Sequence, residues 1–92
     1  YQAAKNCAEK ILRSVWNTHG TLDGLRVIKV LGCVNSTLDY SDQHLVINGC
    51  SDVLVEVLGE RGKHARSAVG MGSLPNGMTV EVEAIIQIKD GY

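Results

Sequence analysis

The sequence predicts an α+β domain of two layers, in which two helices pack on one face of a sheet. Three observations support this fold class. Apolar residues recur at helical spacing at the start of the chain and again in its middle. A run of apolar, β-branched residues lies between these segments, and a strict apolar–polar alternation fills the last part. The expected order is helix, strand, helix, strand, strand, in a single domain over residues 1–92.

The composition narrows the class of protein. The chain has 92 residues, is 45% hydrophobic and 21% charged, and is therefore typical of a globular domain. Its formal net charge of −1 disfavours general nucleic-acid binding, which needs clustered Lys and Arg. No run reaches the ~20 apolar residues of a membrane helix, and no targeting segment is visible. Three cysteines without CxxC spacing favour free, mostly buried thiols, so we expect a cytoplasmic protein.

The first helix is predicted over residues 2–18. Gly20 follows it and can adopt the left-handed conformation that ends a helix. Tyr1 enters the helical pattern at once, so we expect a preceding segment to be missing from this chain. The apolar face of the helix comprises Ala4, Cys7, Ala8, Ile11, Leu12 and Val15.

Residues 25–34 (LRVIKVLGCV) predict a strand. Nearly every position is apolar, which is typical of a strand covered on both faces. Arg26 and Lys29 are then expected near a rim. A polar loop follows over residues 35–42.

Residues 42–58 are ambiguous between helix and strand. Their apolar residues suit a helix, yet Val53, Val55 and Val57 alternate as in a strand. The length of the segment and the stop at Gly59 favour a helix. A strand, a helix and a strand in succession then predict a right-handed parallel crossover.

Two strands are predicted in the last third of the chain, over residues 65–71 and 78–89. The turn signal Leu-Pro-Asn-Gly at 74–77 separates them, so we expect an antiparallel hairpin. No helix remains to cover the polar face of this hairpin, which is expected to carry Arg66, Glu81 and Glu83. Either water or a partner subunit would cover it.

Arg66 is the leading candidate for a binding residue. Its neighbours on the same strand face, Ala68 and Gly70, leave room for a small anion to meet the guanidinium bidentately. Counting across the expected hairpin places Arg66 near Glu83, with Glu81 on the same face. An arginine and a carboxylate in one cleft could anchor an anion and hold or deprotonate a water. The alternative is an ordinary cross-strand ion pair.

Other chemistry has weaker support. The histidines show no metal-ligand spacing with one another or with cysteine, so no metal site is expected. Lys63 and His64 adjoin Arg66 and are expected to make a loop rim positive. No nucleophile elbow, dinucleotide-binding motif or phosphate-binding loop is present. Cys7 and Cys50 fall on apolar helix faces and are expected in the core.

The run GERGKHARSAVGMGSLPNGMTVEVEAIIQI (residues 59–88) resembles the C-terminal signature of the RidA/YjgF family. The matching residues are Arg66, Leu74-Pro75 and the strand Val80-Glu81-Val82-Glu83-Ala84. The segments VNST at 34–37 and INGCSDVLVEV at 47–57 resemble the subgroup once called endoribonuclease L-PSP and likened to chorismate mutase. The resemblance implies the trimeric chorismate mutase-like fold. Its N-terminal strands are absent here, so the chain looks like the C-terminal two-thirds of a member.

The resemblance also implies a function. Family members are homotrimers with clefts between subunits, and active members hydrolyse small 2-imino or enamino acids to 2-keto acids and ammonia. The positions that match place the substrate carboxylate on Arg66, the water on Glu81 and a further contact on Asn48, the last with a one-residue gap. No metal or organic cofactor is implied. Ala68 stands where active members commonly have cysteine, which puts substrate choice in doubt.

Two other functions are weighed against the deaminase. A non-catalytic module that binds a small carboxylate metabolite is favoured by Ala68. Ribonuclease activity, the old name of the subgroup, fits less well, because the chain has a net charge of −1, 4% aromatic residues and no catalytic histidine pair. Neither nucleic acid nor membrane is an expected partner.

Overall fold

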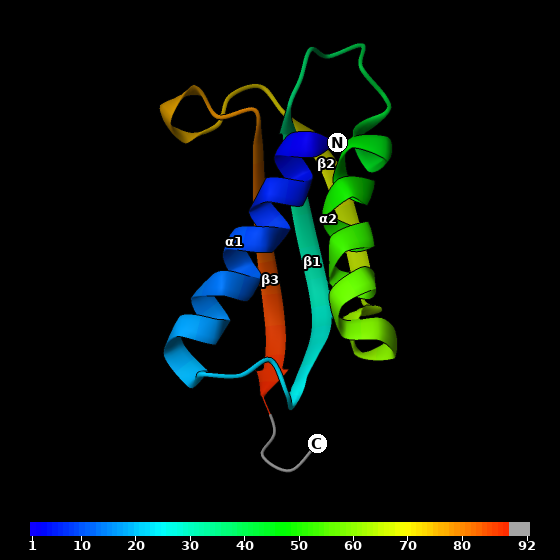
Figure 1. The fold of residues 1–92 in the computed structure, drawn as a ribbon. Helices are drawn as coiled ribbons and strands as arrows, with labels where there is room; N and C mark the ends of the chain where they lie inside the picture. Colours follow the sequence, from blue (N-terminus) through cyan, green and yellow to red (C-terminus); the bar gives the residue numbers. More distant parts are fainter. Residues whose placement is uncertain (89–92) are drawn as a thin grey trace.

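The computed structural model describes residues 1–88 (Figure 1). It confirms the predicted α+β class and the order of two helices and three strands. The strand predicted from residue 78 begins only at Val80, and position 89 lies outside the described residues. The elements are α1 (Gln2–His19), β1 (Leu25–Asn35), α2 (Gln43–Leu58), the 3₁₀ turn η1 (Gly59–Gly62), β2 (Ala65–Met71), the 3₁₀ turn η2 (Pro75–Gly77) and β3 (Val80–Ile88).

The sheet formed by these residues has the order β2-β1-β3. β1 is parallel to β2 and antiparallel to β3. The predicted hairpin between β2 and β3 is therefore wrong, because β1 lies between them. The parallel crossover through α2 is confirmed. This crossover places β2 on one edge of β1. The chain then passes around the end of β1, and β3 pairs with the other edge.

Two hydrogen bonds mark that passage around the end of β1. The N–H of Asn35 donates to the carbonyl of Thr79 at 2.9 Å, and the N–H of Ser36 donates to the carbonyl of Met71 at 3.1 Å. The turn at residues 74–77 therefore spans the width of three strands rather than joining two neighbours. As the most continuously apolar segment, β1 takes the central position, where both of its edges are paired.

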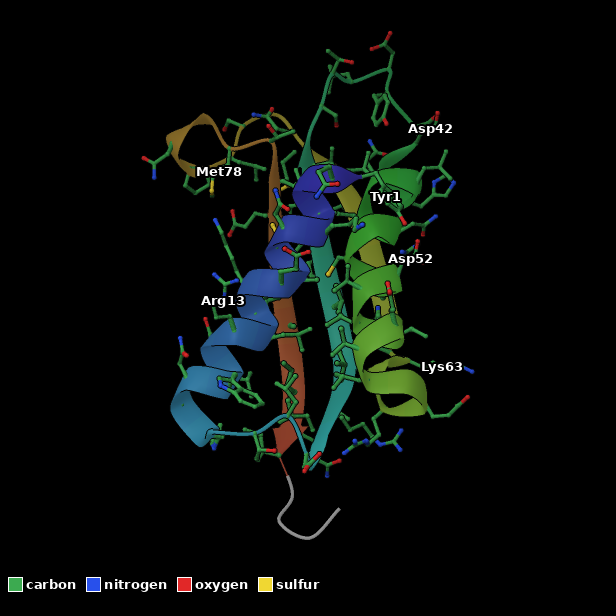
Figure 2. The ribbon with its side chains drawn as sticks, in the orientation of Figure 1. Tyr1, Arg13, Asp42, Asp52, Lys63 and Met78 are labelled. Carbon is green, nitrogen blue, oxygen red and sulfur yellow. The ribbon has the colours of Figure 1, made fainter. Side chains whose placement is uncertain are left out.

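Both helices cover the same face of the sheet, as predicted (Figure 1). α1 ends at Gly20, whose φ of 75° is the left-handed conformation expected there. The hydroxyl of Tyr1 donates to the carboxylate of Asp52 at 2.5 Å and joins the start of α1 to α2 (Figure 2). The buried core between the layers comprises Ala4, Ala8, Leu12, Val27, Val30, Val34, Ile47, Cys50, Val53, Leu54, Leu58 and Val80.

The other face of the sheet has no covering element among residues 1–88. Side chains of β1 on this open face are Lys29, Leu31 and Cys33, which alternate with the buried Val30 and Val34. The prediction that both faces of β1 are covered is therefore wrong for the described chain. Lys29 lies within the strand rather than at its rim, and the register shift between Val27 and Lys29 marks a bulge beside it.

Neither of the two helices in residues 1–88 combines the length and apolar character that a membrane crossing requires.

Candidate functional site

Arg66 lies on the helix-covered side of the sheet. Its register partner in β1 is Val30, which is fully buried beneath the helices. Laterally paired residues point to the same side of a sheet, so Arg66 does too. The expectation that Arg66 shares the open face with Glu81 and Glu83 is wrong. It assumed that β2 pairs with β3, and this pairing does not occur.

The guanidinium of Arg66 is held by α2. Its Nη1 donates to the Oδ1 of Asn48 at 2.8 Å and to the Oγ of Ser51 at 3.2 Å. Asn48 and Ser51 are three residues apart, so one helical turn presents both acceptors on the same side. These two acceptors match the two hydrogens of Nη1. No acceptor among residues 1–88 is bonded to Nε or Nη2, so the edge of the guanidinium that binds carboxylates side-on is available.

Ser51 continues the hydrogen-bond chain to His64. The Oγ of Ser51 lies 2.9 Å from the Nε2 of His64, and the Nδ1 of His64 lies 2.6 Å from the carbonyl oxygen of Gly62. A carbonyl oxygen only accepts, so Nδ1 carries the proton. In the neutral imidazole, Nε2 is then the acceptor of the Ser51 hydroxyl. The chain of donation therefore runs from Arg66 to Ser51, then to His64 and Gly62.

A shallow pocket of 270 Å³ opens beside this chain of hydrogen bonds. It is lined by Ser51, Val55, Lys63, His64 and Arg66. Figure 2 places Lys63 beside the end of α2 that is away from the loop at Asp42. The ammonium of Lys63 forms a salt bridge with Glu60 at 2.8 Å, so its charge is already partnered. Because the lining contains the guanidinium of Arg66 and no carboxylate, the pocket suits a small anion.

Glu81 and Glu83 lie on the open face of the sheet. Their register partners in β1 are Cys33 and Leu31. The prediction that Arg66 lies near Glu83 is therefore wrong, because β2 and β3 occupy opposite edges of β1. Within residues 1–88 no pocket is lined by both Arg66 and Glu81.

The three cysteines differ in their burial and in the face of the sheet on which they lie. Cys50 is fully buried, and its burial raises the pKa of its thiol to about 11. The core position predicted for it is confirmed, and the half-buried Cys7 packs against the same core. Cys33 lies on the open face, where partial burial and then the charges of Glu81 and Glu83 raise its pKa. Within residues 1–88 no three His, Cys, Asp or Glu side chains gather as metal ligands would.

Sequence reasoning named Arg66 and Asn48, and the structure brings these two together. It gave Ser51 no role, and it gave His64 none beyond a positive rim. Two signals were present in the sequence. Ser51 is one helical turn after Asn48, and His64 is two residues before Arg66, which is the spacing of neighbours on one strand face. Neither signal shows that the two side chains meet, because their contact depends on the packing of α2 against β2.

The chain is similar to several known proteins. No family model matches the chain. The curated protein TCP17 of Trypanosoma cruzi is 40% identical over 90 residues, which cover 96% of this chain and 56% of that protein. A crystal structure of a protein of unknown function from Agrobacterium tumefaciens is 49% identical, with a TM-score of 0.90. It matches 94% of this chain and 56% of that one.

Two further solved structures are similar at lower sequence identity. A candidate endoribonuclease from Shewanella oneidensis has a TM-score of 0.85 at 18% identity over 94% of this chain and 57% of its own. A candidate endoribonuclease L-PSP from Entamoeba histolytica has a TM-score of 0.63 at 23% identity over 94% of this chain and 60% of its own. The chain therefore shares the fold of these two endoribonuclease structures, and the predicted RidA/YjgF resemblance is confirmed at the level of the fold. It spans a little more than half the length of these proteins.

Proposed function

We propose that the protein containing this chain hydrolyses small 2-imino or enamino acids to 2-keto acids and ammonia. One observation carries the proposal. The guanidinium of Arg66 is fixed through Nη1 by Asn48 and Ser51, and its Nε and Nη2 edge is left without a partner among residues 1–88. A fixed guanidinium edge over a 270 Å³ pocket matches a small carboxylate in charge, geometry and size.

The reaction needs little beyond placement. Water adds to the electrophilic C=N carbon, the carbinolamine collapses, and ammonia leaves. Because the imine carbon is bonded directly to the carboxylate, anchoring the carboxylate on Arg66 also fixes the reacting carbon. Asn48 contributes by orienting the guanidinium. No metal or organic cofactor has a part in this scheme.

In this proposal, Glu81 acts in the Arg66 pocket of a second copy of the chain. Its position on the open face keeps it from the Arg66 pocket of its own chain. In a homotrimer, the open face of one subunit would cover the pocket side of its neighbour and bring Glu81 to the water. This assembly would also cover half-buried apolar residues such as Leu31, which no element of residues 1–88 shields. Three free cysteines are consistent with a cytoplasmic setting.

The test is turnover by the complete protein. An imino acid is generated in place by a serine or threonine dehydratase, and the appearance of 2-keto acid is followed with and without the protein. We expect acceleration by the wild type and none by Arg66→Ala. Equal rates for the two proteins would refute the deaminase. Folding of the variant is checked by circular dichroism.

A second function is favoured by one specific observation. The described lining of the Arg66 pocket contains no carboxylate, and Ala68 follows Arg66 on the same strand face. A site of this kind could bind a small carboxylate metabolite without turning it over. Binding of a 2-keto acid without imine hydrolysis would identify that module. The names of the two candidate endoribonucleases make RNA cleavage a third assay, although the pocket presents one histidine rather than a pair.

A further inference from the structure

Among the side chains of the Arg66 pocket, Ser51 and His64 are the pair that can exchange a proton. Their atoms Oγ and Nε2 are 2.9 Å apart, within ordinary hydrogen-bond reach. The other ring nitrogen of His64 is fixed on the carbonyl of Gly62 at 2.6 Å, which sets the tautomer. A hydroxyl, a base and a group that orients the base form the arrangement by which proteins move protons.

We infer that Ser51 and His64 carry the proton between water and nitrogen during hydrolysis in this pocket. This inference rests on the proposed deamination and assigns it a shuttle. Both side chains line the pocket that Arg66 also lines. Glu81 cannot do this within one chain, because it lies on the other face of the sheet.

The hydrogen-bond capacities of Ser51 fit a relay. Its hydroxyl hydrogen is donated to Nε2 of His64, and one lone pair accepts from Nη1 of Arg66. One lone pair remains, and a water beside the anchored substrate can donate to it. As the water loses a proton to Oγ, the hydroxyl proton passes to Nε2, and His64 becomes the imidazolium.

The proton balance of the whole reaction closes with these groups. Water adds to the protonated imine as its oxygen bonds to C2, and the C=N electron pair moves to nitrogen. The proton lost by the water passes through Ser51 to His64. It then returns through Ser51 to the amine nitrogen. The C–N bond breaks as the hydroxyl oxygen forms C=O, and the hydroxyl proton leaves with ammonia as ammonium.

The decisive variant is His64→Gln. The glutamine amide can still accept a hydrogen bond from Ser51, but it cannot hold a proton at neutral pH. In the complete protein we expect kcat to fall by about 10²-fold with a nearly unchanged dissociation constant for a 2-keto acid. Ser51→Ala should give a similar loss of kcat. In His64→Ala, added imidazole should restore part of the rate.

His44→Gln is the matched control, because this histidine is exposed at the start of α2 and lines none of the Arg66 pocket. It should leave kcat unchanged. Wild-type kcat in His64→Gln would overturn the shuttle, while an inactive Arg66→Ala would leave the deaminase standing. Loss of 2-keto acid binding in His64→Gln would make His64 a positioning residue and also overturn the shuttle. Absence of turnover by the wild type would overturn both proposals.

Discussion

Arg66 and Glu81 point to opposite faces of one sheet. Arg66 is opposite the buried Val30, whereas Glu81 is opposite Cys33, whose side chain is on the open face. A site that uses both residues must therefore be built from two copies of the chain, with the open face of one against the helix side of another. This geometry makes the assembly of the protein testable through its activity.

Mixing two inactive variants should restore activity. Arg66→Ala and Glu81→Ala are each expected to be inactive alone. After the two proteins are dissociated and reassembled together, roughly a quarter of the sites should combine a native arginine with a native glutamate from different copies. The measurement is the rate of 2-keto acid formation by the mixture. No recovery, in a mixture shown to contain mixed oligomers, would contradict a shared site.

Arg66→Lys keeps the positive charge and removes the planar fork. Lysine cannot donate to Asn48 and Ser51 while presenting two parallel N–H groups to a carboxylate. We expect the affinity for a 2-keto acid to fall by about 10- to 100-fold. Isothermal titration measures this directly. Affinity equal to the wild type would show that the ligand needs charge alone and not the bidentate edge.

Asn48→Asp keeps the oxygen that orients the Arg66 guanidinium and adds a negative charge beside it. The aspartate retains an oxygen for Nη1 of Arg66, but its negative charge competes with a carboxylate ligand for the same guanidinium. Ligand binding should therefore weaken while thermal stability is retained. Asn48→Ala is the companion variant, since it leaves a part-buried N–H unpaired at a cost of about 1–3 kcal/mol. Stronger carboxylate binding by Asn48→Asp would contradict the assigned contact.

Gly32→Ala should destabilise the fold. A Cβ at Gly32 would lie 2.5 Å from carbon atoms of the Ile47 side chain, where α2 packs directly on β1. Overpacking of this kind costs about 1–3 kcal/mol. Gly72→Ala is the control, because nothing lies within 4 Å of its added Cβ. Urea denaturation of both variants measures the difference, and equal midpoints would argue against this close packing.

Cys50 should make stability depend on alkaline pH. Its thiol has a pKa of about 11 in the folded chain, raised from 9.0 mainly by burial. Between these values the unfolded chain loses the proton more readily than the folded one, so stability falls as pH rises from 9.0 to about 11. Denaturation curves at several pH values measure this. Cys50→Ala should flatten that part of the profile, and an unchanged slope would exclude Cys50 as its source.

The sequence predicted elements well and their pairing poorly. Helical spacing and alternation located both helices and all three strands of residues 1–88, because burial of one face imposes these periods locally. The error was the pairing of β2 with β3. A turn signal such as Leu74-Pro75 shows where the chain reverses, but it does not show how far the chain travels before pairing. Here β1, the most apolar strand, takes the centre of the sheet, so β2 and β3 each pair with β1 and not with each other.

The candidate site was likewise predictable in its residue types but not in its tertiary contacts. Arg66 and Asn48 were identifiable by residue type and by resemblance. Ser51 and His64 become neighbours only when the crossover helix lies against β2, which brings together residues 13 apart. Side-chain chemistry is readable from a sequence, whereas such contacts depend on tertiary packing.

The central place of β1 has a consequence for biogenesis. Both of its hydrogen-bonding partners are synthesised after it, so neither edge can be satisfied while the ribosome is still translating α2. Pairing across such sequence separations is slow compared with closing a local hairpin. A nascent chain would thus expose a long apolar strand to its neighbours on a polysome, and chaperone capture at that stage would guard against misassembly.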